Sequence, residues 1–209
     1  MTVLDSPTPP RADRPLAAED LPPPIARWAM PLGITLLTYA VLGSLVMLLT
    51  VGGALAAPML MKMAAPGGEP PRMPMVLLVF VVTGGALSVG LGVLLGVGGL
   101  GVVAQRRVGI ARVQRWAVLR LIIAALSLIL SWLLLPTQVE YNRLAHEWQI
   151  AASNDPRMRE LLGEFDPAAN RRMTMIMQAG GTIAVAIVPF ATLIFLSRAK
   201  VQRQVERWD

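Results

Sequence analysis

The sequence predicts an all-α membrane protein: a four-transmembrane-helix bundle with a short helical cap, on the extracytoplasmic side, between the third and fourth helices. Two observations predict this class. First, the 209-residue chain is 55% hydrophobic and 15% charged, with a mean hydropathy of +0.57, whereas soluble domains average roughly 25% charged residues. Second, the apolar residues form four long blocks, each of the roughly 20 residues that a helix needs to cross a bilayer.

The four blocks give the expected spans, which cover about residues 30–57, 75–103, 116–135 and 173–196. Proline has no amide hydrogen to donate within a helix, so we expect Pro58 and Pro136 to end the first and third spans. Pro189 predicts a kink in the fourth span. The segment 63–74 is rich in proline and glycine, which predicts a short turn between the first two helices.

The spans belong to one membrane domain, residues 27–197, flanked by two tails. Residues 1–26 are rich in proline and acidic residues, a composition that predicts a disordered cytoplasmic tail. Residues 198–209 contain four basic side chains and predict a basic cytoplasmic tail. The outer loop, residues 137–170, is the only sizeable polar segment besides the tails.

The net charge of +6 predicts an orientation in the membrane. In a soluble protein this charge would favour a nucleic-acid partner, but here the basic residues stand beside the apolar blocks, so we expect no nucleic acid. The segment 105–115 has four arginines and no acid, and acts as a cytoplasmic topology anchor: Arg106, Arg107, Arg112 and Arg115. Because cytoplasmic loops are enriched in Lys and Arg, we expect a bacterial inner membrane with both termini in the cytoplasm. Arg171 and Arg172 at the outer end of the fourth span run against this orientation.

Arg120 is a charged residue within the third expected span, one turn from its start. We expect its long stem to carry the guanidinium back to the headgroups. The spans hold no Asp, Glu, Lys or His at mid-membrane depth, although ion pathways and proton relays normally use such residues. This composition argues against an ion-coupled transporter.

The outer loop is expected to be helical. Tyr141, Leu144 and Trp148 fall at i, i+3 and i+7, which predicts one apolar stripe on an amphipathic helix. Arg143 is spaced to pair with Glu140 and Glu147. We expect this helix to cap the outer end of the bundle.

Two Asp-Pro pairs predict further helix starts in the outer loop, because Asp is a favoured N-cap and Pro is favoured at the first helical position. Asp155 precedes Pro156, and Asp166 precedes Pro167. The second pair predicts that the fourth helix begins several residues before the membrane.

A row of small residues recurs every fourth position in the second span: Gly84, Ser88, Gly92 and Gly96. In lipid, small residues let helix backbones approach closely, and the resulting van der Waals contact drives association. The row predicts a helix-packing surface. Tight packing within the chain and an oligomerisation seam both explain it.

Metal and cofactor sites are not expected. Methionines gather near the outer face, and thioethers are soft ligands that suit Cu(I), but no histidine or cysteine reinforces them and methionine also serves as adaptable packing. Residues two apart on a helix, such as Met173 and Met175, point in directions roughly 200° apart. The chain has no cysteine, which excludes disulfides, thiolate metal sites and cysteine nucleophiles.

Catalysis is likewise not expected. The only polar cluster at an interface, and so the only candidate for a lipid-modifying enzyme, is Glu140, Tyr141, Asn142 and His146. We therefore expect a non-enzymatic structural or accessory subunit that packs against itself or a membrane-protein partner within the bilayer. The alternative is a small channel or transporter for a neutral or hydrophobic solute.

Overall fold

The computed structural model describes residues 26–64, 69–153 and 162–208. In this part of the chain the regular structure is entirely helical: α1 (Ala29–Ala64), α2 (Met75–Val103), α3 (Arg107–Leu133), α4 (Leu135–Ala152), α6 (Pro167–Leu196) and α7 (Ala199–Val205). Helices α1, α2, α3 and α6 are long and apolar enough to cross a membrane. The predicted class, a four-helix membrane bundle, is confirmed.

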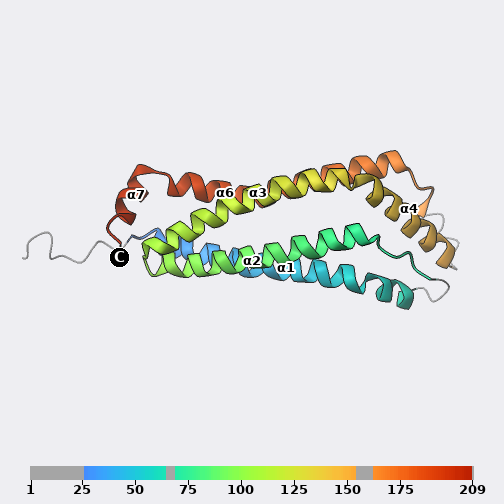
Figure 1. Ribbon diagram of the computed structural model, residues 1–209, viewed down its shortest axis with the longest axis horizontal. Helices are drawn as coiled ribbons and strands as arrows, with labels where there is room; N and C mark the ends of the chain where they lie inside the picture. Colours follow the sequence, from blue (N-terminus) through green and yellow to red (C-terminus); the bar gives the residue numbers. More distant parts are fainter. Residues whose placement is uncertain (1–25, 65–68, 154–161, 209) are drawn as a thin grey trace, which may run out of the picture.

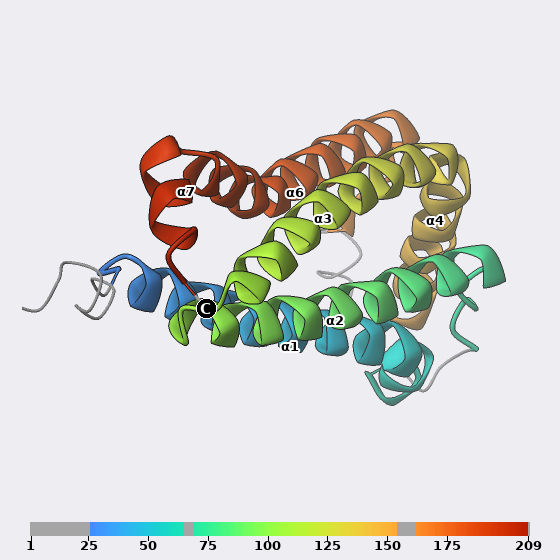
Figure 2. The ribbon, with the colours of Figure 1, turned by 60° about the vertical axis from the view of Figure 1, so that its left-hand side comes forward.

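The four long helices form two pairs that diverge along the molecule (Figures 1 and 2). Each helix packs mainly on the next one in the chain, α1 on α2, α2 on α3 and α3 on α6, while α1 and α6 have no extended contact. We call the end where α1 and α3 begin the terminal end, and the opposite end the far end. The pair α1–α2 and the pair α3–α6 meet at the terminal end and separate toward the far end (Figure 1).

Two expected boundaries were wrong. Helix α1 continues through Pro58 to Ala64, because a proline inside a membrane helix removes only one backbone hydrogen bond and is tolerated there. Helix α3 begins at Arg107, not near residue 116, so most of the arginine-rich connection is helical. The turn between α2 and α3 is short: Gln105 adopts a φ of +53°, and the Arg106 amide donates to the Gly101 carbonyl oxygen at 2.8 Å.

The packed core occupies the terminal half of the bundle. Its most enclosed side chains are at most 2% exposed: Leu36, Leu95, Val102, Val113, Trp116 and Leu196. By contrast, no side chain is buried in residues 41–63 of α1, 118–133 of α3 or 167–188 of α6. We call this part of the bundle, together with the first half of α2, the far half; there α2 buries Leu77 and Gly85, and Gly85 packs on α1.

Helices α1 and α2 approach each other through three glycines of α2 spaced seven residues apart, Gly85, Gly92 and Gly99. A Cβ atom added at Gly99 would lie 3.3 Å from the Gly33 carbonyl oxygen of α1, and one added at Gly92 would lie 3.4 Å from the Ala40 carbonyl oxygen. Seven-residue spacing keeps one face of a helix against its partner in a left-handed crossing. Small residues there allow the close backbone contact that stabilises helix pairs in lipid.

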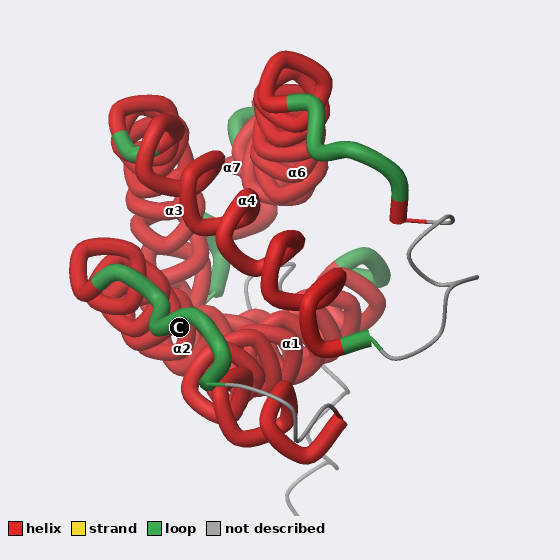
Figure 3. The backbone as a smooth tube through the Cα atoms, turned by 90° about the vertical axis from the view of Figure 1, so that its right-hand side faces the viewer, coloured by secondary structure: helices red, strands yellow, loops and turns green. Residues whose placement is uncertain are grey.

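Helix α4 crosses between the two pairs at the far end and packs on α6 (Figure 3). Gln178 of α6 donates to the Gln138 side-chain oxygen at 2.8 Å, and Asn142 donates to Asn170 at 3.1 Å. The predicted pairing is present, because Arg143 bonds both Glu140 and Glu147, and its hydrogen bond lowers the pKa of Glu140. The expected helical cap is therefore confirmed.

Asp166 caps the start of α6 as predicted. Its side chain accepts hydrogen bonds from the amides of Ala168 and Ala169, at 2.8 and 3.1 Å, which satisfies two of the free donors at the helix start. The other expected start, Asp155 with Pro156, lies outside the described residues. Pro189 is inside α6 and buried.

The segment after α6 folds back over the terminal end instead of extending away from it. Trp208 is 5% exposed and stacks on Trp28 with ring centroids 5.2 Å apart. Trp28 also meets Phe195 edge-on at 5.4 Å and donates to Gln204. Arg107 bonds the Trp208 carbonyl oxygen at 2.7 Å. Residues 198–208 thus contribute a helix and a buried aromatic anchor to the core.

Candidate functional site

The candidate site is a cavity of about 260 Å³ in the middle of the bundle, lined by residues of α1, α2, α3 and α6. It lies where the packed terminal half gives way to the far half. Its walls are mostly apolar, and its polar side chains are Tyr39, Ser44, Ser88 and Arg120. Such a mostly apolar wall with a few polar groups is typical of small-molecule sites.

Arg120 brings a positive charge into this cavity at mid-bundle depth. It stands about halfway along α3, whose 27 residues span roughly 40 Å. Its Nη1 atom donates to the Ser88 hydroxyl oxygen at 2.9 Å, and Ser88 stands near the middle of α2. The guanidinium therefore points across the bundle to a neighbouring helix.

The expectation that Arg120 extends back to the headgroups was wrong. Trp116 lies one turn before Arg120 on the same face of α3 and is 2% exposed, in an edge-on contact with Tyr39 at 5.9 Å. Trp116 and Arg120 both line the cavity, and the guanidinium is bonded across it to Ser88 of α2. The expectation also relied on a helix start near residue 116, whereas α3 begins earlier.

Among the described residues, no carboxylate forms an ion pair with Arg120. The ion pairs found there involve Arg72 and Arg143, both outside the four long helices. A guanidinium carries five N–H donors, and a charge within the hydrocarbon region is expensive unless it is paired or hydrated. The cavity is thus an electropositive site in an otherwise apolar environment.

The four residues of the predicted packing row have different neighbours in the structure. Gly92 packs against Ser44 of α1, and Ser88 bonds Arg120. A Cβ atom added at Gly84 or Gly96 would meet nothing within 4 Å. The glycines that approach α1 are Gly85, Gly92 and Gly99. Their seven-residue spacing is the pattern in the sequence that would have predicted the contact with α1.

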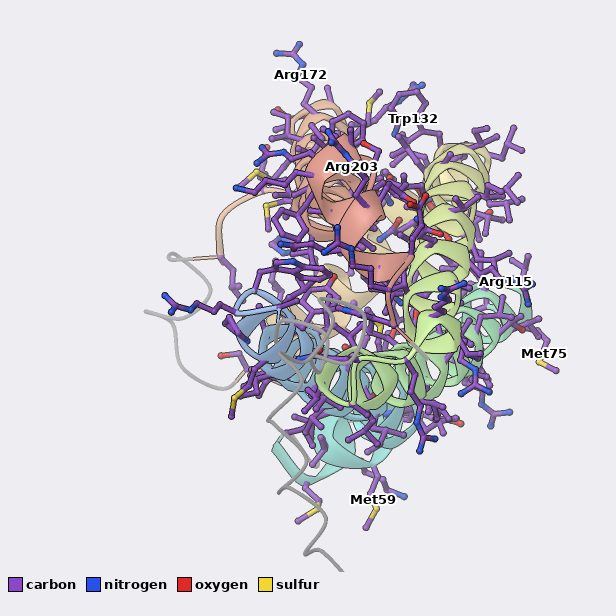
Figure 4. All side chains as sticks on the ribbon, turned by 90° about the vertical axis from the view of Figure 1, so that its left-hand side faces the viewer. Met59, Met75, Arg115, Trp132, Arg172 and Arg203 are labelled. Atoms are coloured by element: carbon purple, nitrogen blue, oxygen red, sulfur yellow. The ribbon has the colours of Figure 1, made fainter. Side chains whose placement is uncertain are left out.

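The four arginines of the predicted topology anchor are all exposed at the terminal half. Arg107 holds the backbone of the C-terminal segment through the carbonyl oxygens of Glu206 and Trp208. Arg106 and Arg112 border a surface depression with Gly101 and Gly109. Arg115 points away from the bundle (Figure 4).

The methionines considered for copper do not converge in the described part of the chain. Met59, Met63 and Met75 are 69%, 72% and 73% exposed, and Figure 4 shows Met59 and Met75 pointing outward at separate places. The described residues also hold no cluster of three His, Cys, Asp or Glu side chains. The methionine surface is an apolar surface at the far end.

The polar cluster considered for lipid chemistry is not brought together. Glu140 pairs with Arg143, and Asn142 bonds Asn170 of α6. His146 places its Nε2 atom 3.1 Å from the Gly163 carbonyl oxygen, and its ring contacts Phe165 at a centroid distance of 5.6 Å. Asn142 and His146 thus connect α4 to neighbouring segments, whereas Glu140 pairs within α4.

Comparison of the chain with known protein families, with curated proteins and with solved structures finds no match. A functional assignment therefore depends on the chain's own geometry: an integral membrane protein of four long helices, with no buried side chain in the far halves of α1, α3 and α6 and with a mid-bundle cavity that contains Arg120.

Proposed function

We propose that this protein is an accessory or structural subunit, without a catalytic role, whose far half packs against another membrane-spanning chain. One observation carries the proposal: the core ends near the middle of the bundle, and residues 41–63, 118–133 and 167–188 contain no buried side chain. Helices in lipid associate through van der Waals packing. In the far half α1 still packs on α2 through Gly85, but these stretches of α1, α3 and α6 bury no side chain, which leaves their surfaces available to a partner.

Glycines in the far half support the same function. A Cβ atom would meet nothing within 4 Å at Gly52 and Gly53 of α1, at Gly84 of α2, or at Gly180 and Gly181 of α6. Each glycine within a helix costs about 1 kcal/mol relative to alanine, and packing inside this chain does not account for these positions. Close approach of a partner helix does account for them.

Cysteine cross-linking in native membranes tests the proposal, because the chain has no cysteine of its own. We expect Gly53→Cys and Gly180→Cys to form cross-linked species, either at twice the mass of the 22.5 kDa chain, for a second copy, or at another mass, for a different partner. Leu100→Cys, 59% exposed near the terminal end, is the matched control and should stay monomeric. Monomers at all three positions, together with a single copy per lipid nanodisc, would rule the proposal out.

We also propose that the terminal end faces the cytoplasm of a bacterial cell. The four exposed arginines of the topology anchor support this orientation, because Lys and Arg are enriched on the cytoplasmic side. A cysteine introduced at Gln204, on helix α7, should then react with an impermeant thiol reagent only after the cells are opened. Labelling of intact spheroplasts would reverse the assigned orientation.

The cavity favours a second candidate function, the binding or transport of a hydrophobic solute. Its volume of about 260 Å³ is slightly below the roughly 300–1,000 Å³ typical of ligand pockets, and the two helix pairs diverge in the adjoining far half. A bound chain could extend from the cavity along the diverging helices. This function makes the protein a carrier or sensor of a molecule that partitions into the bilayer.

A further inference from the structure

We infer that the mid-bundle cavity binds an anionic amphiphile, with an oxyanion head group on the Arg120 guanidinium and a hydrocarbon chain along the apolar walls. The inference rests on the second function proposed above and specifies its ligand. The observation that supports it is the position of Arg120, which is bonded to Ser88 at 2.9 Å inside a cavity whose other lining residues are mostly apolar.

Charge complementarity determines the sign of the head group. Arg120 is half-buried and has no carboxylate partner among the described residues. Among the described side chains, Arg120 donates one hydrogen bond, to Ser88, so other N–H groups of the guanidinium can bind a ligand. The planar guanidinium matches the two oxygens of a carboxylate or phosphate group. An anion at this position would neutralise a charge that is otherwise costly at this depth.

The walls determine that the ligand has an apolar chain. Leu91 and Leu95 of α2, Met47 of α1, Val185 of α6 and the Trp116 indole line the cavity beside Arg120. Ser44 and Tyr39 place hydroxyl groups on its α1 side, within the same cavity as the guanidinium. A ligand with one charged end and one apolar end satisfies both parts, whereas a free inorganic anion would leave the apolar wall without a partner.

A narrow alkyl chain fits this cavity better than a partner helix, whose diameter with side chains is roughly 10 Å. All four long helices contribute to the lining, so Arg120 faces the interior of the bundle. A narrow alkyl chain can extend from this cavity into the far half.

Native mass spectrometry of the protein released from zwitterionic lipid nanodiscs tests the inference with three probes. Laurate has a carboxylate head, dodecanol has the same chain length without a charge, and inorganic phosphate has a charge without a chain. We expect laurate to remain bound at concentrations at least tenfold lower than dodecanol, and phosphate to give no adduct. Phosphate binding without laurate binding would overturn the inference in favour of a free-anion site.

Arg120→Gln removes the charge and keeps a polar, shorter side chain. Its matched control is Arg115→Gln, which removes an exposed arginine of the same helix that points away from the bundle. We expect Arg120→Gln to weaken laurate binding about tenfold or more, the range for a lost charged hydrogen bond, and Arg115→Gln to leave it unchanged. Equal weakening by both variants would mean that laurate binds at the surface and would contradict the inference.

A cysteine introduced into the cavity, with Arg120 left intact, tests the inference even if Arg120→Gln fails to fold. Gly43 lines the cavity, and a Cβ atom added there meets nothing within 4 Å, so Gly43→Cys is tolerated and provides a single thiol. Laurate should slow its modification by a small thiol reagent at least fivefold, dodecanol should do so less, and Leu100→Cys, near the terminal end and outside the cavity, should be unaffected. Equal protection by laurate and dodecanol would overturn the anionic ligand while leaving a hydrophobic solute. No protection and no adduct with either would remove both proposals.

Discussion

Gly109→Ala is expected to destabilise the bundle by about 3 kcal/mol, a large effect for one methyl group. The Gly109 and Gly101 backbones are in contact where α2 and α3 meet, and a Cβ atom at Gly109 would lie 2.6 Å from the Val102 nitrogen and 2.7 Å from the Gly101 Cα. Backbone atoms cannot rotate away as a side-chain end can, so the two helices must separate. Overpacking of this kind typically costs 1–3 kcal/mol, and sometimes more.

Unfolding by SDS in mixed micelles, followed by circular dichroism, measures this change. Gly96→Ala is the matched control, because it adds the same methyl group to an adjacent helix where nothing lies within 4 Å. The control should be as stable as the parent, or more stable by up to about 1 kcal/mol from helix propensity. Equal stability of the two variants toward SDS would show that α2 and α3 are not in close contact at Gly109.

Trp208→Ala is expected to release the C-terminal segment from the terminal end. The substitution removes a side chain that is 5% exposed and stacked on Trp28, and Trp→Ala changes in cores cost roughly 3–5 kcal/mol. Helix α7 has only seven residues, too few to persist alone in water. We therefore expect its amides to lose their protection from hydrogen exchange.

Hydrogen exchange followed by mass spectrometry of the segment 199–208 measures this release. Trp132→Ala is the control, because Trp132 is 47% exposed near the far end and makes no contact with α7. The long helices should keep their protection in both variants, since the core of α2 and α3 does not depend on Trp208 alone. If the α7 amides kept their protection in Trp208→Ala, backbone contacts such as the Arg107 bond would be sufficient to hold the C-terminal segment on the terminal end.

Helix starts and ends were predictable from the sequence where they depend on nearby residues. Asp166 caps α6 through amides two and three residues ahead, and the Arg143 pairs of α4 join residues three and four apart. Pro58 was misjudged because a proline's effect depends on its neighbours, and α1 simply continues past it. The arginines of 107–115 were expected in a connection between spans, whereas Arg107, Arg112 and Arg115 are exposed residues of α3.

The candidate site was only partly predictable. Ser88 and Gly92 were identified as members of a small-residue row, yet one bonds Arg120 and the other packs on α1. Arg120 was identified as a charge within a span, but its guanidinium bonds Ser88 of α2, a residue 32 positions away in the chain. A sequence pattern shows which residues share a helix face, and it does not show what lies opposite that face.

By itself, the sequence determined the four membrane-length helices, the capping helix and the position of the polar segment between the third and fourth long helices, because hydrophobic length, caps and short-range pairs are local properties. Only the tertiary structure decided which glycines meet α1, where the core ends, how Trp208 closes the terminal end and where the Arg120 guanidinium points. These features join residues far apart in the chain, and in a bilayer the apolar faces of all four helices look alike to a hydropathy pattern. Close packing between specific side chains is what distinguishes them.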